Sequence, residues 1–342
     1  MANLLNMGPS PHIRTSETIE EVMYDVVIAL LPALFVAIYV FGVRALVLVV
    51  VSVLTCLATE YVCSKLLGKK PTILDGSAII TGILFAFVLP ITISIPTVIA
   101  GAVVSISLGK MVFGGLGFNV FNPALVGRAF VQASWAAAIT NFSGIHKIAG
   151  VFRYDVLVSS VPDKAGNAVY LAGPTVLTAM KSGLDVEHLT TAIINQGGNP
   201  YLQAFLGKMG GCIGEVSSLA ILLGGLYLIY KKQIDFKIPV ITIGTVFLLT
   251  WAMGANPLMH IFSGGLFLGA FFMATDMVTR PVTCLGRVIY SIMLGGLISL
   301  IRIKGGYPEG TAYAILIMNG ITPLIERYTG PKKFGEVKAN EK

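Results

Sequence analysis

Five carboxylate side chains lie inside or beside apolar stretches of the chain, where an ionised group costs about 3 kcal/mol or more. Such a charge is a candidate for an ion or cofactor path. Four of the five fall close to the end of a stretch, where a carboxylate can reach the interface or cap a helix. Glu215, in GGCIGEVSSLA, is the deepest, and a plain buried hydrogen-bonding role is its alternative. The five are Asp25, Glu60, Glu215, Asp276 and Glu326.

Asp276 lies in the segment TDMVTRPVT, together with Thr275, Thr279 and Arg280. These groups predict either a polar pocket at the inner membrane face or a capped helix end. The four histidines are dispersed and the four cysteines have no C-x-x-C spacing, so we expect no metal site. The chain has no P-loop, zinc-protease or serine-hydrolase motif, and we expect no catalytic residues in it.

The segment LAGPTVLTAMKSG indicates a different chemistry. Its Gly173–Pro174 pair predicts a turn into a short helix over residues 176–181. Thr175 then lies in the first turn, where free backbone N–H groups and the helix dipole favour an anion. Lys181 adds a positive charge. These residues suit a phosphate attached to Thr175, and an ordinary capped loop helix is the alternative.

The composition indicates what kind of protein holds these groups. Of the 342 residues, 55% are hydrophobic and 12% are charged, and the mean hydropathy is +0.82. A soluble domain has about 25% charged residues, so most of this chain is expected to lie in lipid. The 24 Lys and Arg residues exceed the 17 Asp and Glu residues, but no basic cluster is interleaved with aromatics. We therefore expect no nucleic-acid partner.

Apolar stretches that are long enough to span, or nearly span, a hydrocarbon core occur ten times. Several of them are short and rich in glycine. We therefore predict an all-α polytopic membrane protein with about ten transmembrane helices. The stretches are residues 22–41, 45–64, 74–90, 95–113, 121–139, 210–230, 237–253, 257–275, 284–302 and 310–326.

The charges of the connecting segments predict the orientation. Lysine and arginine gather in alternate connections and in the C-terminal tail, whereas PITISIP and GANP have no charge. Because cytoplasmic loops carry the excess of Lys and Arg, we expect both termini inside and the long connection, residues 140–209, outside. Only Arg44, Arg302 and Lys304 lie against the rule.

The chain contains two weakly similar halves with matching order. DGSAIITGILFAF is similar to IFSGGLFLGAFFM, GKMVF to GRVIY, and NPALVGRAF to NGITPLIERY. Five helices per copy is an odd number, so the second copy must be inverted in the membrane. The glycine-rich breaks FGGLGFN and KGGYPEG follow the fourth helix of each copy, where such breaks line binding sites or merely allow close packing. We divide the chain into a cytoplasmic tail (1–20), a first five-helix repeat (21–139), an outer loop (140–209), a second five-helix repeat (210–329) and a second cytoplasmic tail (330–342).

Six segments carry a resemblance to a known family: SPHIR, MYDVVIALLPA, DGSAIITGILFAFVLP, FNPALVGRAF, ATDMVTRPV and GGYPEGTAYAILIMN. Almost the whole chain resembles the D subunit of the Rnf complex, the ion-translocating ferredoxin:NAD+ oxidoreductase of bacteria. That subunit is related to the B subunit of the sodium-pumping NADH:quinone reductase. The short N-terminal tail is more similar to the Rnf subunit.

The resemblance implies an FMN that is joined through its phosphate to a threonine hydroxyl, in a segment similar to S/T-G-A-T. In AGPTVLT the glycine, the threonine and the following leucine match, which selects Thr175 with Gly173 beside it and Lys181 as counter-charge. Thr178 is the fallback. Alanine, proline and valine replace three residues of the family pattern at positions 172, 174 and 169.

The resemblance also permits a second, non-covalent flavin near the repeat interface. Residues that would line this site or an ion path are Glu215, Asp276, Arg280, Asn122 and Arg128.

The function implied is electron relay on the outer side of a bacterial cell membrane, coupled to transport of Na+ or H+. The implied partners are the other subunits of the complex, chiefly the one with the other covalent FMN and the small integral membrane subunits. Catalysis would belong to the assembled complex. The alternative is an inverted-repeat channel or secondary transporter for a small solute, without flavin.

Overall fold

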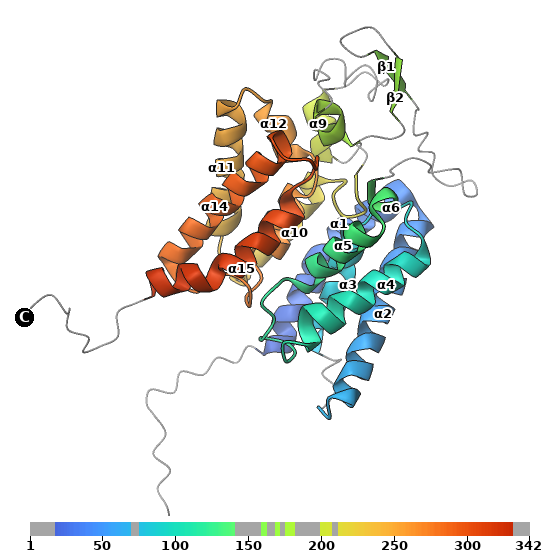
Figure 1. Ribbon diagram of the computed structural model, residues 1–342, viewed down its shortest axis with the longest axis vertical. Coiled ribbons are helices and arrows are strands. Elements are labelled where there is room, and N and C mark those ends of the chain that lie inside the picture. Colours follow the sequence, from blue (N-terminus) through green and yellow to red (C-terminus); the bar gives the residue numbers. More distant parts are fainter. Residues whose placement is uncertain are drawn as a thin grey trace, which may run out of the picture.

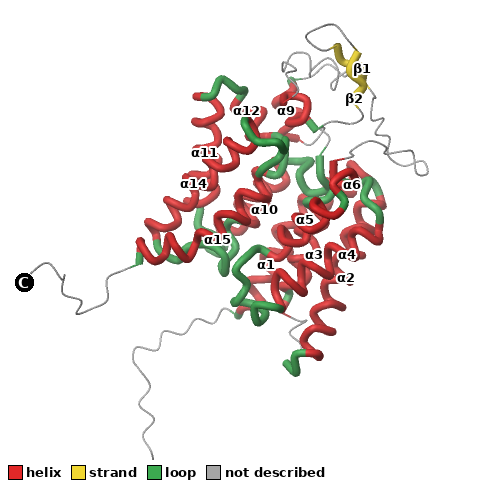
Figure 2. Tube along the Cα trace, in the orientation of Figure 1, coloured by secondary structure: helices red, strands yellow, loops and turns green. Residues whose placement is uncertain are grey.

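The computed structural model describes residues 18–69, 75–140, 159–162, 168–171, 175–181, 199–206 and 211–330. Helices dominate these residues (Figure 2), and the predicted helical architecture is confirmed. One small exception lies within the long connection. There the strands β1 (Ser159–Pro162) and β2 (Ala168–Leu171) pair antiparallel.

The first half of the chain forms a bundle of helices (Figure 1). Thr18 caps the first helix in a reciprocal arrangement with Glu21, whose side chain accepts from the Thr18 N–H at 3.0 Å. The third helix is only 11 residues long and most of its side chains are buried. The elements are α1 (Ile19–Phe41), α2 (Val43–Leu66), α3 (Ser77–Phe87), α4 (Ile95–Ile106), the π-helix η2 (Ser107–Met111), α5 (Pro123–Ser134) and α6 (Ala136–Thr140).

The second half forms a separate group of helices beside the first (Figure 1). The third apolar stretch of this half, residues 257–275, is broken into shorter pieces. The break lies at Ser263, which is extended, and at Gly264, whose φ of +72° favours glycine. The elements are α10 (Ser218–Tyr230), α11 (Lys237–Ala252), α12 (Pro257–Phe262), α13 (Leu266–Leu268), the π-helix η3 (Gly269–Met273), α14 (Cys284–Ile303) and α15 (Thr311–Thr329).

The described parts of the long connection lie together at one end of the helices, which we call the outer end. They are the sheet, α7 (Val176–Lys181) and α9 (Pro200–Leu206). The beginning of α1 and the end of α15 lie at the opposite, inner end (Figure 1). The predicted short helix over residues 176–181 is confirmed by α7.

Three helices in the described part of the chain are long and apolar enough to cross a membrane, namely α1, α2 and α14. Several predicted continuous spans are wrong in detail. Stretch 121–139 is divided at Trp135, stretch 210–230 becomes helical only at Ser218, and stretch 257–275 is divided at Ser263 and Gly264. For two of them the reason is local: the Ser217 side chain caps the start of α10, and Gly264, with a φ of +72°, follows the end of α12.

Two helix pairs join the halves: α1 packs on α10, and α5 packs on α15. At the first crossing the backbones approach so closely that a Cβ atom on Gly224 would lie 2.0 Å from the carbonyl oxygen of Ala29. Close approach of this kind is typical of small residues between membrane helices. Residues 211–217 add a third link, since the N–H groups of Ile213 and Gly214 donate to the carbonyls of Leu89 and Phe87 at 3.0 and 2.8 Å.

Candidate functional site: two polar centres at opposite ends

Thr175 is the N-cap residue of α7. Its hydroxyl oxygen accepts from the Thr178 N–H at 3.3 Å and lies 2.8 Å from the Thr178 hydroxyl. The side chain is half-buried. An N-cap oxygen satisfies one of the free N–H groups of the helix start, so the local geometry explains why threonine stands here. Gly173 lies outside the described residues.

Lys181, at the other end of α7, is exposed and does not contact Thr175 in the described structure. Its Nζ donates to the carbonyl of Gly305 and, at 3.0 Å, to that of Tyr307. Partial desolvation lowers the pKa of this amine below its ordinary value. The lysine therefore fastens α7 to the break between α14 and α15.

Thr175 lines a cavity of about 400 Å³, including its opening to solvent, which we call the outer cavity. Its wall comes from five separate segments of the chain, so the long connection and the membrane helices share it. The Ser263 hydroxyl, 6% exposed, has no hydrogen-bond partner among the described residues. The lining residues are Thr175, Leu177, Ala204, Gly211, Glu215, Val216, Phe262, Ser263, Gly264 and Glu309.

An ion-pair network closes the base of the outer cavity. Arg128 on α5 lies 3.3 Å from Glu215 and 3.0 Å from Glu309, measured from guanidinium nitrogen to carboxylate oxygen. Glu309 also accepts from the backbone N–H of Gly265. Arg302 donates to the carbonyl of His260 and, at 3.4 Å, to the Thr311 hydroxyl. We call Arg128, Glu215, Glu309 and Arg302 the outer charge network.

The network holds two arginines and two glutamates, so its formal charges balance. Cys212, Glu215 and Glu309 can each offer one ligand atom, and these three atoms lie within 4.8 Å of one another. Arg128 contacts both carboxylates, and the nearby Arg302 supplies the second positive charge. The geometry therefore favours a structural ion-pair network over a metal site.

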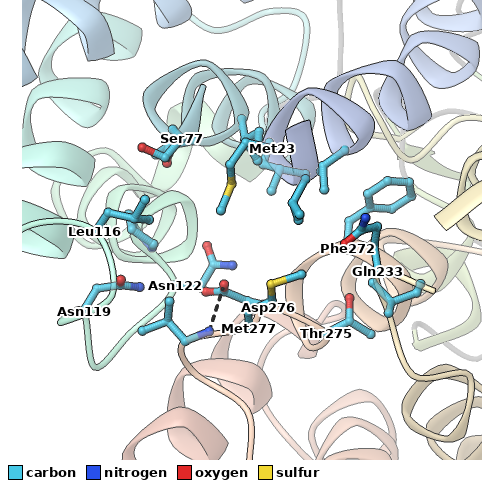
Figure 3. A pocket seen from close by; sticks show the side chains of 18 of the residues that line it. Met23, Ser77, Leu116, Asn119, Asn122, Gln233, Phe272, Thr275, Asp276 and Met277 are labelled. Atoms are coloured by element: carbon cyan, nitrogen blue, oxygen red, sulfur yellow. Dashed lines mark hydrogen bonds between the residues drawn. The ribbon is translucent and has the colours of Figure 1, made fainter. Parts of the chain in front are cut away.

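A second cavity, which we call the inner cavity, lies between the two halves at the inner end. It measures about 820 Å³ including its opening to solvent. Asn119 and Asn122 come from the break after η2, while Thr275 and Asp276 come from the break after η3, and Figure 3 shows them around one space. Its wall is otherwise mainly apolar, with contributions from α1, α3, α10 and η3.

One edge of the inner cavity contains a buried ion pair. Lys110, in η2, lies 2.7 Å from Glu60 on α2 and donates to the Ser77 hydroxyl at 2.6 Å. Both charged side chains are at most 2% exposed. The π-helix places this lysine, and such insertions are frequent at functional sites.

The predicted site residues thus separate into two groups. Glu215 and Arg128 meet at the outer end, and Asn122 and Asp276 line the inner cavity. The Asp276 carboxylate accepts from the Thr279 hydroxyl at 3.3 Å. Of the residues in the predicted polar pocket, Thr275 and Asp276 line the inner cavity, whereas Thr279 does not. Arg280 is not among the residues that line the inner cavity.

Sequence reasoning missed Glu309, Arg302 and Lys110 as site residues. Glu309 is the only acidic residue in KGGYPEG, which was a usable signal. Arg302 lay against the charge rule, and that anomaly now has a cause, because the side chain is buried in the outer charge network. Lys110 lies 50 residues from its partner, a distance that no local pattern reveals.

The NQR2, RnfD, RnfE family model matches residues 6–335 of the chain. The D subunit of the ion-translocating oxidoreductase complex of Stutzerimonas stutzeri is 36% identical, with 94% of this chain and 93% of that protein covered. The D subunit of the proton-translocating ferredoxin:NAD(+) oxidoreductase complex of Clostridium ljungdahlii is 42% identical, with 97% of each chain covered. The D subunit of the Na(+)-translocating ferredoxin:NAD(+) oxidoreductase complex of Acetobacterium woodii is 44% identical, with 98% of this chain and 96% of that protein covered.

Proposed function

Because the chain belongs to the NQR2, RnfD, RnfE family, we propose that it is the D subunit of an ion-translocating ferredoxin:NAD+ oxidoreductase complex. The observation that carries this proposal is the similarity over nearly the full length of two relatives that bear this name. The chain would be one subunit of a redox-driven translocase and would hold no complete active site of its own. Its place is the bacterial cell membrane.

In this proposal the chain crosses the membrane about ten times, in two inverted five-helix repeats (21–139 and 210–329). The pairing of α1 with α10 and of α5 with α15 joins the first helix of one repeat to the first of the other, and the fifth to the fifth. Such pairs are expected around a two-fold axis in the membrane plane. The fourth helices also end at opposite faces, since Lys110 borders the inner cavity whereas Gly305 contacts α7.

The same arrangement supports the proposed orientation. The start of α1 and the end of α15 lie at one end of the molecule, and α7, α9 and the sheet lie at the other (Figure 1). Both termini would be cytoplasmic, with the 140–209 loop outside, because the positively charged connections lie on the side of the termini.

The proposed cofactor is FMN, joined through its phosphate to Thr175. The threonine suits this bond, since an esterified N-cap oxygen can still accept from the Thr178 N–H, and the half-buried side chain lies at a cavity. Gly173 would give the turn that precedes it. Lys181 was expected to be the counter-charge of the phosphate, but its amine donates to backbone carbonyls, including that of Tyr307, instead of approaching Thr175.

A bound flavin would supply one- and two-electron redox chemistry, and the protein would supply its position. The outer charge network ties α5 to the segments on both sides of the cavity and so fixes the wall against which Thr175 lies. Electrons would pass along the outer side of the membrane, to or from the subunit with the other covalent FMN and the small integral membrane subunits.

The inner cavity is the proposed place for a second, non-covalent flavin. Its mainly apolar wall with a few amide, hydroxyl and charged groups has the character of a cofactor site. Asn122 and Asp276 would face the polar edge of the ring system. Glutamates and aspartates near the two cavities are the candidates for an ion path, and the relatives' names give Na+ in one case and H+ in another.

Intact mass spectrometry of the purified full-length chain tests the cofactor proposal. The expected mass exceeds that of the polypeptide by one FMN less one water, and the denatured chain shows flavin fluorescence on a gel. Thr175→Ala should remove both signals, whereas Thr178→Ala should keep them. A colourless wild-type chain with no added mass would contradict the proposal and favour the solute channel or transporter.

A further inference from the structure

The break between α14 and α15 presents an aromatic surface at the outer end of the molecule. Tyr307 is 48% exposed, and its ring stacks on that of Tyr313, with centroids 5.6 Å apart and planes inclined at 26°. An aromatic side chain that is already fixed against a second ring loses little further freedom when a flat ligand stacks on it. Residues 304–310 therefore offer a rigid flat face to a planar ligand.

The short helix α7 runs along this same break. Its C-terminal residue, Lys181, donates to the carbonyls of Gly305 and Tyr307. Its N-cap residue, Thr175, shares the outer cavity with Glu309. A six-residue helix is about 9 Å long, so α7 and the Lys181 side chain together connect the outer cavity to the carbonyl of Tyr307.

The break is held in place by strong contacts on both sides. Glu309 is bound by Arg128 and by the Gly265 N–H. A Cβ atom on Gly310 would lie 2.5 Å from the Ile301 side chain, which shows how tightly the break folds back on α14. The aromatic pair is thus fixed relative to Thr175 before any ligand arrives.

We propose that Tyr307, supported by Tyr313, is the stacking platform for the isoalloxazine ring of a flavin esterified at Thr175. This inference rests on the proposed covalent FMN. The phosphate and the five-carbon ribityl chain of FMN bridge a span comparable to the length of α7. The ring then lies over the exposed face of Tyr307 in an offset stack, the geometry that aromatic rings prefer. Tyr307 is a positioning residue in this arrangement and takes no part in the redox step.

Flavin fluorescence tests the platform without measuring activity. A phenol in contact with an excited flavin quenches its fluorescence by donating an electron that then returns, whereas a phenyl ring does not. The full-length chain in detergent should therefore show a severalfold longer flavin lifetime in Tyr307→Phe than in the wild type, and Tyr307→Trp should restore the short lifetime. Thr175→Ala gives the background from any flavin that is not bound at Thr175. Tyr328→Phe is the matched control, because Tyr328 is 80% exposed near the inner end of α15.

Intact mass, recorded on the same samples, separates the two proposals. If the wild-type chain carries no FMN, the cofactor proposal fails before the platform is examined. If the wild type and the Tyr307 variants carry FMN on Thr175 but the lifetime of Tyr307→Phe equals that of the wild type, the platform is overturned. An equal lengthening of the flavin lifetime in Tyr328→Phe would also overturn the platform, because the effect would then not depend on a tyrosine at position 307.

Discussion

Arg128 on α5 and Glu309 in the break before α15 are separated by 181 residues in the sequence, and their charged groups lie 3.0 Å apart. The two residues belong to different halves of the chain. Their contact makes the outer cavity a joint product of both halves, and the loop that contains Thr175 rests on it. A change at either residue should therefore affect the stability of the whole molecule.

We expect Arg128→Ala to destabilise the folded chain by about 3–5 kcal/mol, because it leaves the buried Glu215 and the partly buried Glu309 without their shared cation. Thermal unfolding in detergent measures the effect. Lys304→Ala is the control, since Lys304 is exposed and its loss should change the midpoint little. If both variants unfold at the wild-type temperature, the outer charge network does not stabilise the folded chain.

For the buried pair of Lys110 and Glu60, we expect the single and double variants to differ in stability. Lys110→Met alone should cost about 3–5 kcal/mol, whereas the double variant Lys110→Met/Glu60→Leu should regain most of this loss, because an apolar pair often replaces a buried ion pair at little cost. Unfolding midpoints of the two single variants and the double variant form the cycle. Additive losses would show that the two side chains are not coupled.

The crossing of α1 and α10 predicts a strong effect of one methyl group. Gly224→Ala should destabilise the chain by about 1–3 kcal/mol through overpacking, since the new Cβ would lie 2.0 Å from the carbonyl oxygen of Ala29. Gly244→Ala in α11 is a matched control, as no atom lies within 4 Å of its added Cβ. There the better helix propensity of alanine predicts no loss, or a gain of up to about 1 kcal/mol. Equal midpoints for the two variants would refute the close crossing.

Cysteine labelling measures the proposed orientation. The natural Cys284 is exposed at the start of α14, on the proposed cytoplasmic side. A membrane-impermeant maleimide should label it in inside-out vesicles and leave it unlabelled in intact cells. In a Cys284→Ser background, the added cysteine of Leu206→Cys, on α9, should show the reverse pattern. Labelling of both positions from the same side would exclude the topology.

Much of the fold was predictable because hydropathy and glycine breaks are local signals. The stretches 22–41, 45–64, 237–253 and 284–302 match the observed helices α1, α2, α11 and α14 within a few residues. The divisions at Trp135 and Ser263 were not predicted, since apolar sequence continues across them. At both divisions the backbone leaves the helical region: Trp135 has φ −133° and ψ 56°, and the extended Ser263 precedes Gly264, whose φ is +72°.

For the candidate site, the sequence indicated several of the residues but not which of them lie together. Burial cost singled out Glu215 and Asp276, and each of them lines a cavity. They were expected along one path, whereas the structure places them in two separate centres. The partners of Arg128 could not be read from the sequence, because they lie 87 and 181 residues away, in segments that only the tertiary packing brings together. Proline and glycine in YPEG marked a break without indicating that its glutamate pairs with Arg128.

The contact between α1 and α10 also sets an order of events during synthesis. Ribosomes add roughly 5–20 residues per second, so roughly 10–40 s separate the emergence of Phe41 from that of Tyr230. During this interval the first half must wait in the bilayer with the Ala29 surface uncovered. A nascent chain in this state can pair with wrong helices. The close crossing at Ala29 excludes any helix that does not place a glycine opposite this residue.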